Sequence, residues 1–236
     1  MPTTLITGAN RGIGLGLARS YTARGWEVIA CCRQPQDAQD LEALTRGAPT
    51  LRIEALDVTS AASIAALSDR LAVRAIDLLI NNSGAIGPFP LVENLPRQRF
   101  GHLDLDLWMD VLKVNTLGPV KLAEALVEQV ARSEQKKIVT LSSSVGSIGA
   151  CDIAAMAYAT SKAAVNKAMQ LTASALRERE IHVLTVCPGH VRTRMAMGGG
   201  ELEVEESVEA LVSLFARIDA THSGRFLSHT GEPIPW

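Results

Sequence analysis

Short apolar runs alternate with longer stretches of helical spacing along the chain, and this alternation limits its possible folds more than any other feature. The apolar runs lie at residues 3–7, 27–32, 51–56, 76–81, 137–142, 182–187 and 224–229. Helices are predicted between them, at 11–24, 37–44, 60–73, 106–131, 154–177 and 204–217. Near-continuously apolar strands separated by helices are typical of a parallel sheet covered on both faces. With right-handed crossovers, the sequence predicts an α/β fold with a doubly wound, mostly parallel, Rossmann-like sheet.

Length and composition fit one domain of this kind. The chain has 236 residues, of which 47% are hydrophobic and 20% charged, as in an ordinary globular protein with a sizeable core. The run Gly198-Gly199-Gly200 is interpreted as a local loop, because too little chain follows it to build a second core. We therefore expect residues 1–236 to form a single domain.

Charge and apolar runs argue against several classes of protein. The net charge of -2 gives no reason to expect binding to nucleic acid or to an anionic membrane. No apolar run reaches the roughly 18 residues of a membrane span, and the first residues lack the pattern of a signal peptide, so we expect a cytoplasmic protein. The four cysteines lack the spacing of metal ligands, so no metal site is expected.

A turn with three glycines follows the first predicted strand and precedes the first predicted helix. Glycine at this junction lets the backbone turn tightly and lets a diphosphate approach, while the helix amides and dipole favour the anion. A glycine-rich turn without a ligand is the alternative, but its place in the first βαβ unit favours a dinucleotide. The turn residues expected to bind it are Gly8, Asn10, Arg11, Gly12, Ile13 and Gly14.

This turn also carries a resemblance to a known family. Residues 7–14 read TGANRGIG, a G-x-x-x-G-x-G spacing that resembles the glycine motif of the short-chain dehydrogenase/reductase family. The tail and the segments ANRGIGLGLAR and VNTLGP resemble the carbonyl reductase branch that includes the sniffer and C-factor proteins. The resemblance spans nearly the whole chain and implies one dinucleotide-binding and catalytic domain over residues 1–236.

The residues after the second predicted strand favour NADP over NAD. An NAD site usually has an acidic residue there for the ribose 2′-hydroxyl, whereas a nearby arginine accommodates a 2′-phosphate. Here Cys32 lies at the acidic position, with Arg33 beside it and Arg11 in the glycine turn. A guanidinium pairs bidentately with phosphate, so we expect NADP(H) as the cofactor. The alternative is that both arginines are solvated surface residues.

The resemblance implies further contacts with the dinucleotide. The segment Asn-Asn-Ser-Gly at 81–84 is similar to the family's Asn-Asn-Ala-Gly, and residues 188–193 are similar to its Pro-Gly-x-x-x-Thr segment, which contacts the nicotinamide. Asp57 and Val58 match the pair that contacts adenine, although a strand-end aspartate followed by a Ser60 helix cap is the alternative. The residues carried over are Asp57, Val58, Asn82, Gly84, Pro188, Gly189, Val191 and Thr193, and Tyr158 and Lys162 are also expected to bind the cofactor, Lys162 at the nicotinamide ribose.

A tyrosine and a lysine one helical turn apart follow the fifth predicted strand. Tyr158 and Lys162 share a helix face, and the chain has only one other tyrosine. The pKa of free tyrosine is about 10, and a nearby ammonium lowers it by favouring the phenolate. We therefore expect Tyr158 to act as an acid or base near neutral pH, with Lys162 adjusting its pKa. The alternative is an ordinary pair on a helix surface.

Two more catalytic residues are implied by the resemblance. The family's strand-Ser-Ser pattern places the serine that polarises the substrate oxygen at Ser143, with Ser144 as the alternate. Strand-end serines that cap backbone groups are the other interpretation. Asn115 resembles the helix asparagine that holds a water in a proton relay to the lysine, and a structural asparagine is the alternative. His190 is not expected to be the catalytic base.

These features together predict reduction of a ketone or aldehyde by NADPH. We expect a neutral, moderately apolar carbonyl substrate, since the residues predicted to line the pocket are apolar. An NAD-dependent alcohol dehydrogenase and a non-catalytic dinucleotide-binding signalling protein are the alternatives.

By analogy with the family we expect a homodimer or homotetramer, while residues 195–201 are either a mobile lid or a plain flexible loop. The predicted lining comprises Ile86, Phe89, Ile148, Cys151, Ile153, Met195 and Met197.

Overall fold

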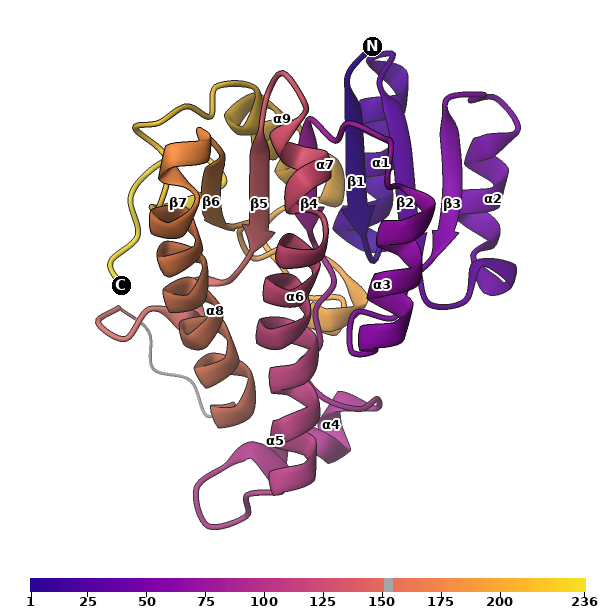
Figure 1. Cartoon of the computed structure of the whole chain (residues 1–236). Coiled ribbons are helices and arrows are strands. Elements are labelled where there is room, and N and C mark those ends of the chain that lie inside the picture. Colours follow the sequence, from indigo (N-terminus) through magenta and orange to yellow (C-terminus); the bar gives the residue numbers. More distant parts are fainter. Residues whose placement is uncertain (151–154) are drawn as a thin grey trace.

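Parallel strands form one continuous sheet through the centre of the molecule (Figure 1). The structure is a computed structural model that describes residues 1–150 and 155–236. Within these residues, seven strands lie in the order β3-β2-β1-β4-β5-β6-β7, and every pair of neighbours is parallel. The strands are β1 (Thr3–Thr7), β2 (Glu27–Cys32), β3 (Leu51–Ala55), β4 (Leu78–Asn81), β5 (Lys137–Leu141), β6 (His182–Cys187) and β7 (Phe226–Ser228).

Helices cover both faces of this sheet. The helices of the described residues are α1 (Gly12–Ala23), α2 (Gln39–Thr45), α3 (Ala61–Arg70), α4 (Leu91–Asn94), α5 (Leu105–Leu112), α6 (Gly118–Ala125), α7 (Val127–Ala131), α8 (Met156–Ala175) and α9 (Val204–Ala216). Short 3-10 turns occur at Pro35–Asp37, Leu95–Gln98, Ser144–Gly146, Arg177–Arg179 and Arg194–Ala196.

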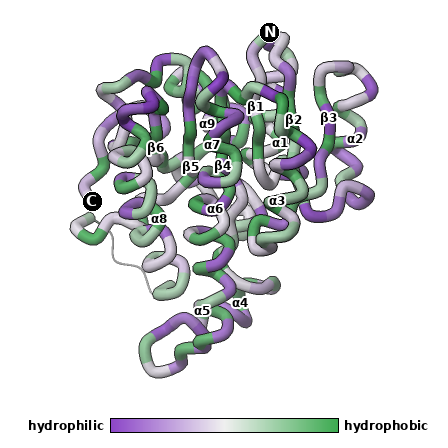
Figure 2. Tube along the Cα trace, viewed as in Figure 1, coloured by the Kyte–Doolittle hydropathy of each residue, from purple (hydrophilic) through white to green (hydrophobic). Residues whose placement is uncertain are grey.

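The hydrophobic core is divided by the sheet into two layers. One buried cluster packs α1, α2 and α9 on one face, and the other packs α3, α6, α7 and α8 on the opposite face. Neighbouring residues of a strand point to opposite faces, so Ile6 belongs to the first cluster and Leu5 to the second. Two-sided burial explains the continuous apolar strands that Figure 2 shows in green near the centre. The predicted doubly wound α/β fold is confirmed.

The helix predicted over 106–131 is present but interrupted. The structure has α5, a π-helical turn at Lys113–Leu117, and then α6 and α7. Pro119 explains the wide turn, because it has no N–H for the Asn115 carbonyl four residues earlier and its ring would clash there. The interruption therefore lies at a predicted site residue, Asn115.

A second difference is the segment between β4 and α5, where the sequence predicted only a loop. Helix α4 and the 3-10 turn Leu95–Gln98 form there, and Figure 1 shows α4 and the start of α5 projecting beyond the carboxyl ends of the strands. Arg97 binds Asp104, and Asp104 caps α5 by accepting a hydrogen bond from Leu107 N at 2.9 Å. These bonds join the projecting segment to α5.

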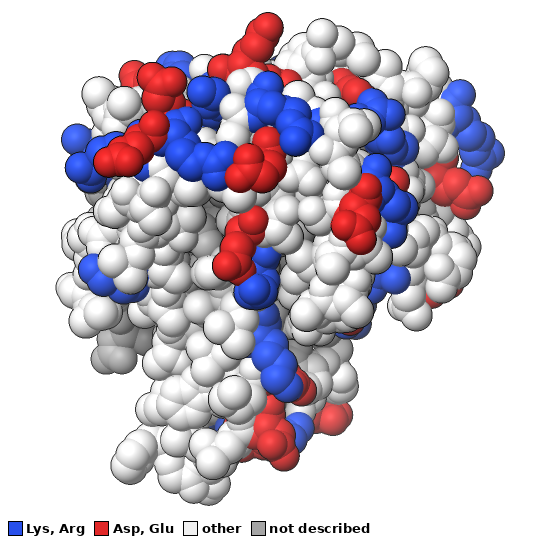
Figure 3. Space-filling model, in the orientation of Figure 1, with Lys and Arg blue, Asp and Glu red and all other residues white. Residues whose placement is uncertain are grey.

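Charged side chains of both signs are mixed over much of the face seen in Figure 3. A stripe along α5 and α6 contains the pairs Lys113–Asp110 and Lys121–Glu124, and a broad uncharged area lies beside it over α8 (Figure 3). In the described part of the chain, no helix has both the length and the hydropathy required to cross a bilayer.

Candidate active site

The glycine turn joins β1 to α1 at the carboxyl edge of the sheet. Gly8 and Gly12 have φ angles of 64° and 52°, in the left-handed region that favours glycine. A Cβ on Gly14 would lie 2.3 Å from Gly8 O, so only glycine permits this approach of helix to turn. Helix α1 has no side-chain cap at Arg11 and no acidic residue in its first turn. Its first amides and its positive dipole end therefore suit the diphosphate of a dinucleotide.

Hydrogen bonds hold the turn after β1 against the turn after β4. Thr7 Oγ1 accepts hydrogen bonds from Asn82 N at 3.0 Å and from Ser83 N at 2.9 Å. Asn82 Nδ2 donates to Thr7 O at 2.7 Å and to Gly8 O at 3.1 Å. The Asn82 side chain thus fixes the turn after β4 against the predicted dinucleotide-binding turn.

Arg33 and Asp57 lie beyond the carboxyl ends of the adjacent strands β2 and β3. Partial burial acts to raise the pKa of Asp57, but hydrogen bonds from Thr59 and the charge of Arg33 outweigh it and lower this pKa. Asp57 Oδ1 accepts from Thr59 N at 2.9 Å, and Ser60 caps α3. The alternative considered for this segment, an aspartate at the strand end followed by a Ser60 helix cap, is therefore present. Arg33 is exposed beside the predicted ribose end of the cofactor site.

The segment after β6 crosses back over the glycine turn. Gly189 has a φ of 88°, and a Cβ there would lie 2.5 Å from the Leu202 side chain. Thr193 lies against the glycine turn, with its Cγ2 3.6 Å from where a Gly12 Cβ would be. Arg192 N donates to Leu202 O at 2.9 Å, so the 195–201 loop is pinned at its base.

Most of the predicted dinucleotide ligands thus follow strand ends at one edge of the sheet. They come after β1, β2, β3, β4 and β6, and Gly8, Gly14 and Asn82 touch one another directly. These strand-end residues are Gly8, Asn10, Arg11, Gly12, Ile13, Gly14, Arg33, Asp57, Val58, Asn82, Gly84, Pro188, Gly189, Val191 and Thr193, and the other two predicted ligands, Tyr158 and Lys162, lie on α8.

Helix α8 brings Tyr158 and Lys162 to the same edge, beside the end of β5. The Lys162 ammonium lies 5.7 Å from the centre of the Tyr158 ring, and its Nζ donates to Leu141 O at 3.0 Å. Ser143, two residues after β5, lies close enough to the Tyr158 hydroxyl to lower the pKa of that group, and its Oγ accepts a hydrogen bond from Val145 N at 3.4 Å. Ser144 instead donates its backbone N–H to Cys187 Sγ at 3.2 Å, and its side chain is exposed. The geometry therefore favours Ser143 of the two serines.

Burial dominates the pKa values of this pair. It raises the pKa of Tyr158 to about 12, against a lowering effect of the Ser143 hydrogen bond and a smaller raising effect of the Cys187 charge. Burial also lowers the pKa of Lys162 to about 8, opposed by Cys187. The sequence predicted a lowered tyrosine pKa, but in the structure burial raises it. Because its pKa is lowered to about 8, Lys162 loses its proton at a much lower pH than an exposed lysine does.

Asn115 is held by protein groups on both ends of its amide. Its Oδ1 accepts from Ala85 N at 2.7 Å, while Nδ2 donates to Ala85 O at 2.7 Å and to Ser161 Oγ at 2.9 Å. The side chain is 1% exposed and joins the π-helical turn to the loop after β4 and to α8. The structural alternative for its side chain is therefore realised, whereas the water relay stays a prediction.

Sequence reasoning missed two residues near this edge. Gln98 is buried and accepts a hydrogen bond from Tyr158 N at 3.1 Å. Arg194 stacks on Phe89, with its guanidinium carbon 4.0 Å from the ring centre, so a cation lies on a wall expected to be apolar. Lone polar residues in predicted loops gave no signal for these contacts. The predicted lining residues Cys151 and Ile153 lie outside the described residues.

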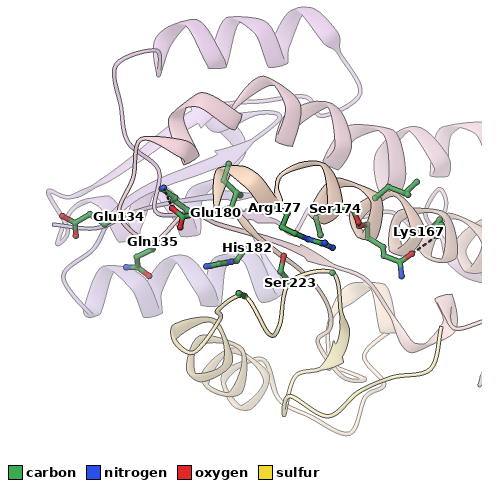
Figure 4. A pocket seen from close by; sticks show the side chains of 15 residues that line it. Glu134, Gln135, Lys167, Ser174, Arg177, Glu180, His182 and Ser223 are labelled. Atoms are coloured by element: carbon green, nitrogen blue, oxygen red, sulfur yellow. Dashed lines mark hydrogen bonds and ion pairs between the residues drawn. The ribbon is translucent and has the colours of Figure 1, made fainter.

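A hollow of about 830 Å³ lies at the opposite end of the sheet (Figure 4). It surrounds the amino ends of β5, β6 and β7, and Glu134, Arg177 and His182 are among its lining residues. Its Lys136 pairs with Glu180 at 3.5 Å, and Lys167 donates to Gln170 at 2.8 Å. This hollow contains none of the predicted site residues.

Comparison with known proteins agrees with this geometry. The family model for short-chain dehydrogenases matches residues 2–202. The chain belongs to the short-chain dehydrogenase/reductase family. As a member of this family it is an oxidoreductase, and the predicted family resemblance is confirmed.

Relatives in this family cover the whole chain. An uncharacterized oxidoreductase of Schizosaccharomyces pombe is 35% identical, over 98% of this chain and 96% of its own. The crystal structure of an NADPH-bound carbonyl reductase from chicken fatty liver matches with a TM-score of 0.90 and 31% identity, over 100% of this chain and 99% of its own. The carbonyl reductase Sniffer of Drosophila melanogaster matches with a TM-score of 0.90 and 27% identity, over 100% of both chains.

Proposed function

We propose that this oxidoreductase uses NADPH to reduce a ketone or aldehyde to an alcohol, with Tyr158 as the proton donor. The observation that carries the proposal is the gathering of Ser143, Tyr158 and Lys162 at the sheet edge that also holds the glycine turn. Residues 1–236 would act as one dinucleotide-binding and catalytic unit. A cytoplasmic location stays a prediction.

The chain's own residues fit a dinucleotide. The positive-φ glycine turn, the uncapped start of α1 and the exposed Arg33 suit a diphosphate and a 2′-phosphate. NADPH binding by the chicken carbonyl reductase supports the same choice of cofactor. When bound, the nicotinamide supplies the hydride that the carbonyl carbon receives.

The protein residues would handle the oxygen of the substrate. Ser143 donates a hydrogen bond to the carbonyl oxygen, polarising it, and Tyr158 transfers its hydroxyl proton to that oxygen as the carbon is reduced. A buried cation beside the tyrosine stabilises the phenolate that remains, which is the role of Lys162. Asn115 fixes the turn that faces Lys162 and, with a water, would return a proton to it.

The substrate is proposed to be a neutral, moderately apolar carbonyl compound. Ile86, Phe89, Ile148 and Met195 lie on the loops that border the predicted site. Arg194 is the exception on this wall, but its stacking on Phe89 already occupies one face of that ring.

The uncharged area over α8 in Figure 3 supports a homodimer or homotetramer, which light scattering would test.

The first prediction tests Tyr158 as the acid. NADPH consumption is measured with a panel of aldehydes, ketones and quinones, for the unchanged protein and for Tyr158→Phe. We expect the variant to lose at least about a hundredfold in kcat, because general acid catalysis contributes 10²–10⁴-fold. Its Kd for NADPH should stay near the original value. Full turnover by Tyr158→Phe would reject the proposed mechanism.

A further inference from the structure

Gln98 is a buried amide at the end of the segment that projects between β4 and α5. Its side chain is 1% exposed, although its neighbours Arg97 and Arg99 are exposed. Oε1 accepts a hydrogen bond from Tyr158 N at 3.1 Å, and Nε2 donates to Ile86 O. One side chain therefore binds both the helix that carries the proposed acid and the loop that borders the proposed substrate site.

The bond to Tyr158 replaces a missing helix cap. Tyr158 N is the third amide of α8, a position that the N-cap side chain normally serves. The N-cap residue of α8 is Ala155, which has no side-chain acceptor. Gln98 supplies that acceptor from a different part of the chain, and it does so at the proposed catalytic residue itself.

A glycine next to Ile86 makes room for the Gln98 side-chain amide. Gly87 has a φ of 138°, and a Cβ there would lie 3.1 Å from Gln98 Nε2. The loop after β4 thus leaves room for the Gln98 amide at a residue without a side chain. Two independent features, an uncapped helix and a glycine beside the amide, meet at Gln98.

We propose that Gln98 is a positioning residue that sets the distance between the proton donor Tyr158 and the substrate wall at Ile86. This inference rests on the proposed carbonyl reduction. Displacing a reacting group by about 1 Å can cost a hundredfold in rate, so a bond that locates the acid's helix affects kcat. Gln98 itself does not touch the reacting atoms.

The test uses two substitutions with matched controls at the exposed neighbour Arg99. Gln98→Met keeps the length of the side chain and removes both hydrogen bonds, and Arg99→Met is its control. We expect Gln98→Met to lower kcat on the order of tenfold. The Kd for NADPH should be unchanged, and hydrogen exchange at the Tyr158 amide should be faster. Arg99→Met should change none of the three.

Gln98→Glu separates positioning from a general loss of packing. A protonated carboxyl accepts from Tyr158 N and donates to Ile86 O as glutamine does, whereas an ionised carboxylate cannot donate. Activity should therefore be near normal at low pH and fall as the introduced carboxyl ionises, above the ordinary glutamate pKa of about 4.3 because burial raises that pKa. Arg99→Glu should lack this extra limb in its pH profile.

The outcomes distinguish the two proposals. Normal kcat and normal Tyr158 exchange in Gln98→Met, or a Gln98→Glu pH profile equal to that of Arg99→Glu, would overturn the role of Gln98. If Gln98→Met does not fold, the pH profile of Gln98→Glu decides. If the unchanged protein reduces no carbonyl, the proposed function fails, while the exchange rate of the Tyr158 amide still tests the placement of Gln98.

Discussion

At the residue scale, the proposed chemistry depends on the burial of the Lys162 ammonium beside the Tyr158 phenol. Lys162 is 5% exposed and has only a carbonyl, Leu141 O, as its hydrogen-bond acceptor within the described residues. A buried ammonium without a carboxylate loses hydration, and its pKa falls to about 8. Tyr158 lies beside it with a pKa raised to about 12, so the phenol keeps its proton near neutral pH and is available as a proton donor.

This depressed pKa predicts a dependence of stability on pH. Between about pH 8 and the ordinary lysine value of about 10.4, the unfolded chain binds a proton at Lys162 that the folded protein does not. The free energy of unfolding should therefore rise with pH, by about 1.4 kcal/mol per unit relative to Lys162→Met. Urea unfolding of both proteins across this range measures the difference. A constant difference would show that Lys162 keeps an ordinary pKa.

At the element scale, the cleft depends on the close approach of α1 to the end of β1. The helix begins directly over Gly8, and Gly14 leaves no room for a side chain. The π-helical turn at Lys113–Leu117 acts similarly on the other face, because it turns the Asn115 side chain to the loop after β4. Both features bring backbone groups close to the proposed site.

Gly14→Ala tests this close approach. The added Cβ would lie 2.3 Å from Gly8 O and 2.5 Å from Asn82 Nδ2, so the helix or the turn must move. We expect a loss of about 1–3 kcal/mol in unfolding free energy and weaker NADPH binding. Gly47→Ala is the control, since nothing lies within 4 Å of a Cβ there. Equal stability of the two variants, measured by urea unfolding, would contradict the packing described.

At the scale of the whole molecule, the proposed cofactor site spans the sheet from the end of β3 to the end of β6. A ligand that contacts both halves of the sheet stabilises the fold in proportion to its affinity. The exposed Arg33 beyond β2 is the residue that would distinguish a 2′-phosphate from a hydroxyl. Cofactor preference should therefore be visible in the melting temperature of the entire protein.

NADPH should raise the melting temperature more than NADH. At about 100 times its Kd a ligand adds about 2.7 kcal/mol, which is roughly 5–10 °C for a protein of this size. Arg33→Ala should reduce the NADPH shift toward that of NADH, and the exposed Arg46→Ala should leave it unchanged. Differential scanning fluorimetry provides the measurement. Equal shifts for both cofactors in the unchanged protein would reject the preference for NADP.

Sequence patterns were sufficient wherever a local rule applied. The apolar strands, the glycine turn and the Tyr158–Lys162 spacing each reflect a short-range requirement: burial on two faces, a tight turn or one helix face. The interruption at Asn115 was also encoded locally, in Pro119, but helical periodicity concealed it. Gln98 and the Arg194–Phe89 stack had no such pattern, because their partners lie far away in the chain.

The sequence by itself determined the doubly wound sheet, the glycine turn and the family. Only the tertiary structure decided which serine lies near Tyr158, that burial raises the pKa of this tyrosine, and that Gln98 accepts a hydrogen bond from the Tyr158 amide. The physical reason is that strands and turns follow from the residues next to them. Burial and side-chain hydrogen bonds instead depend on segments that meet only when the sheet has formed.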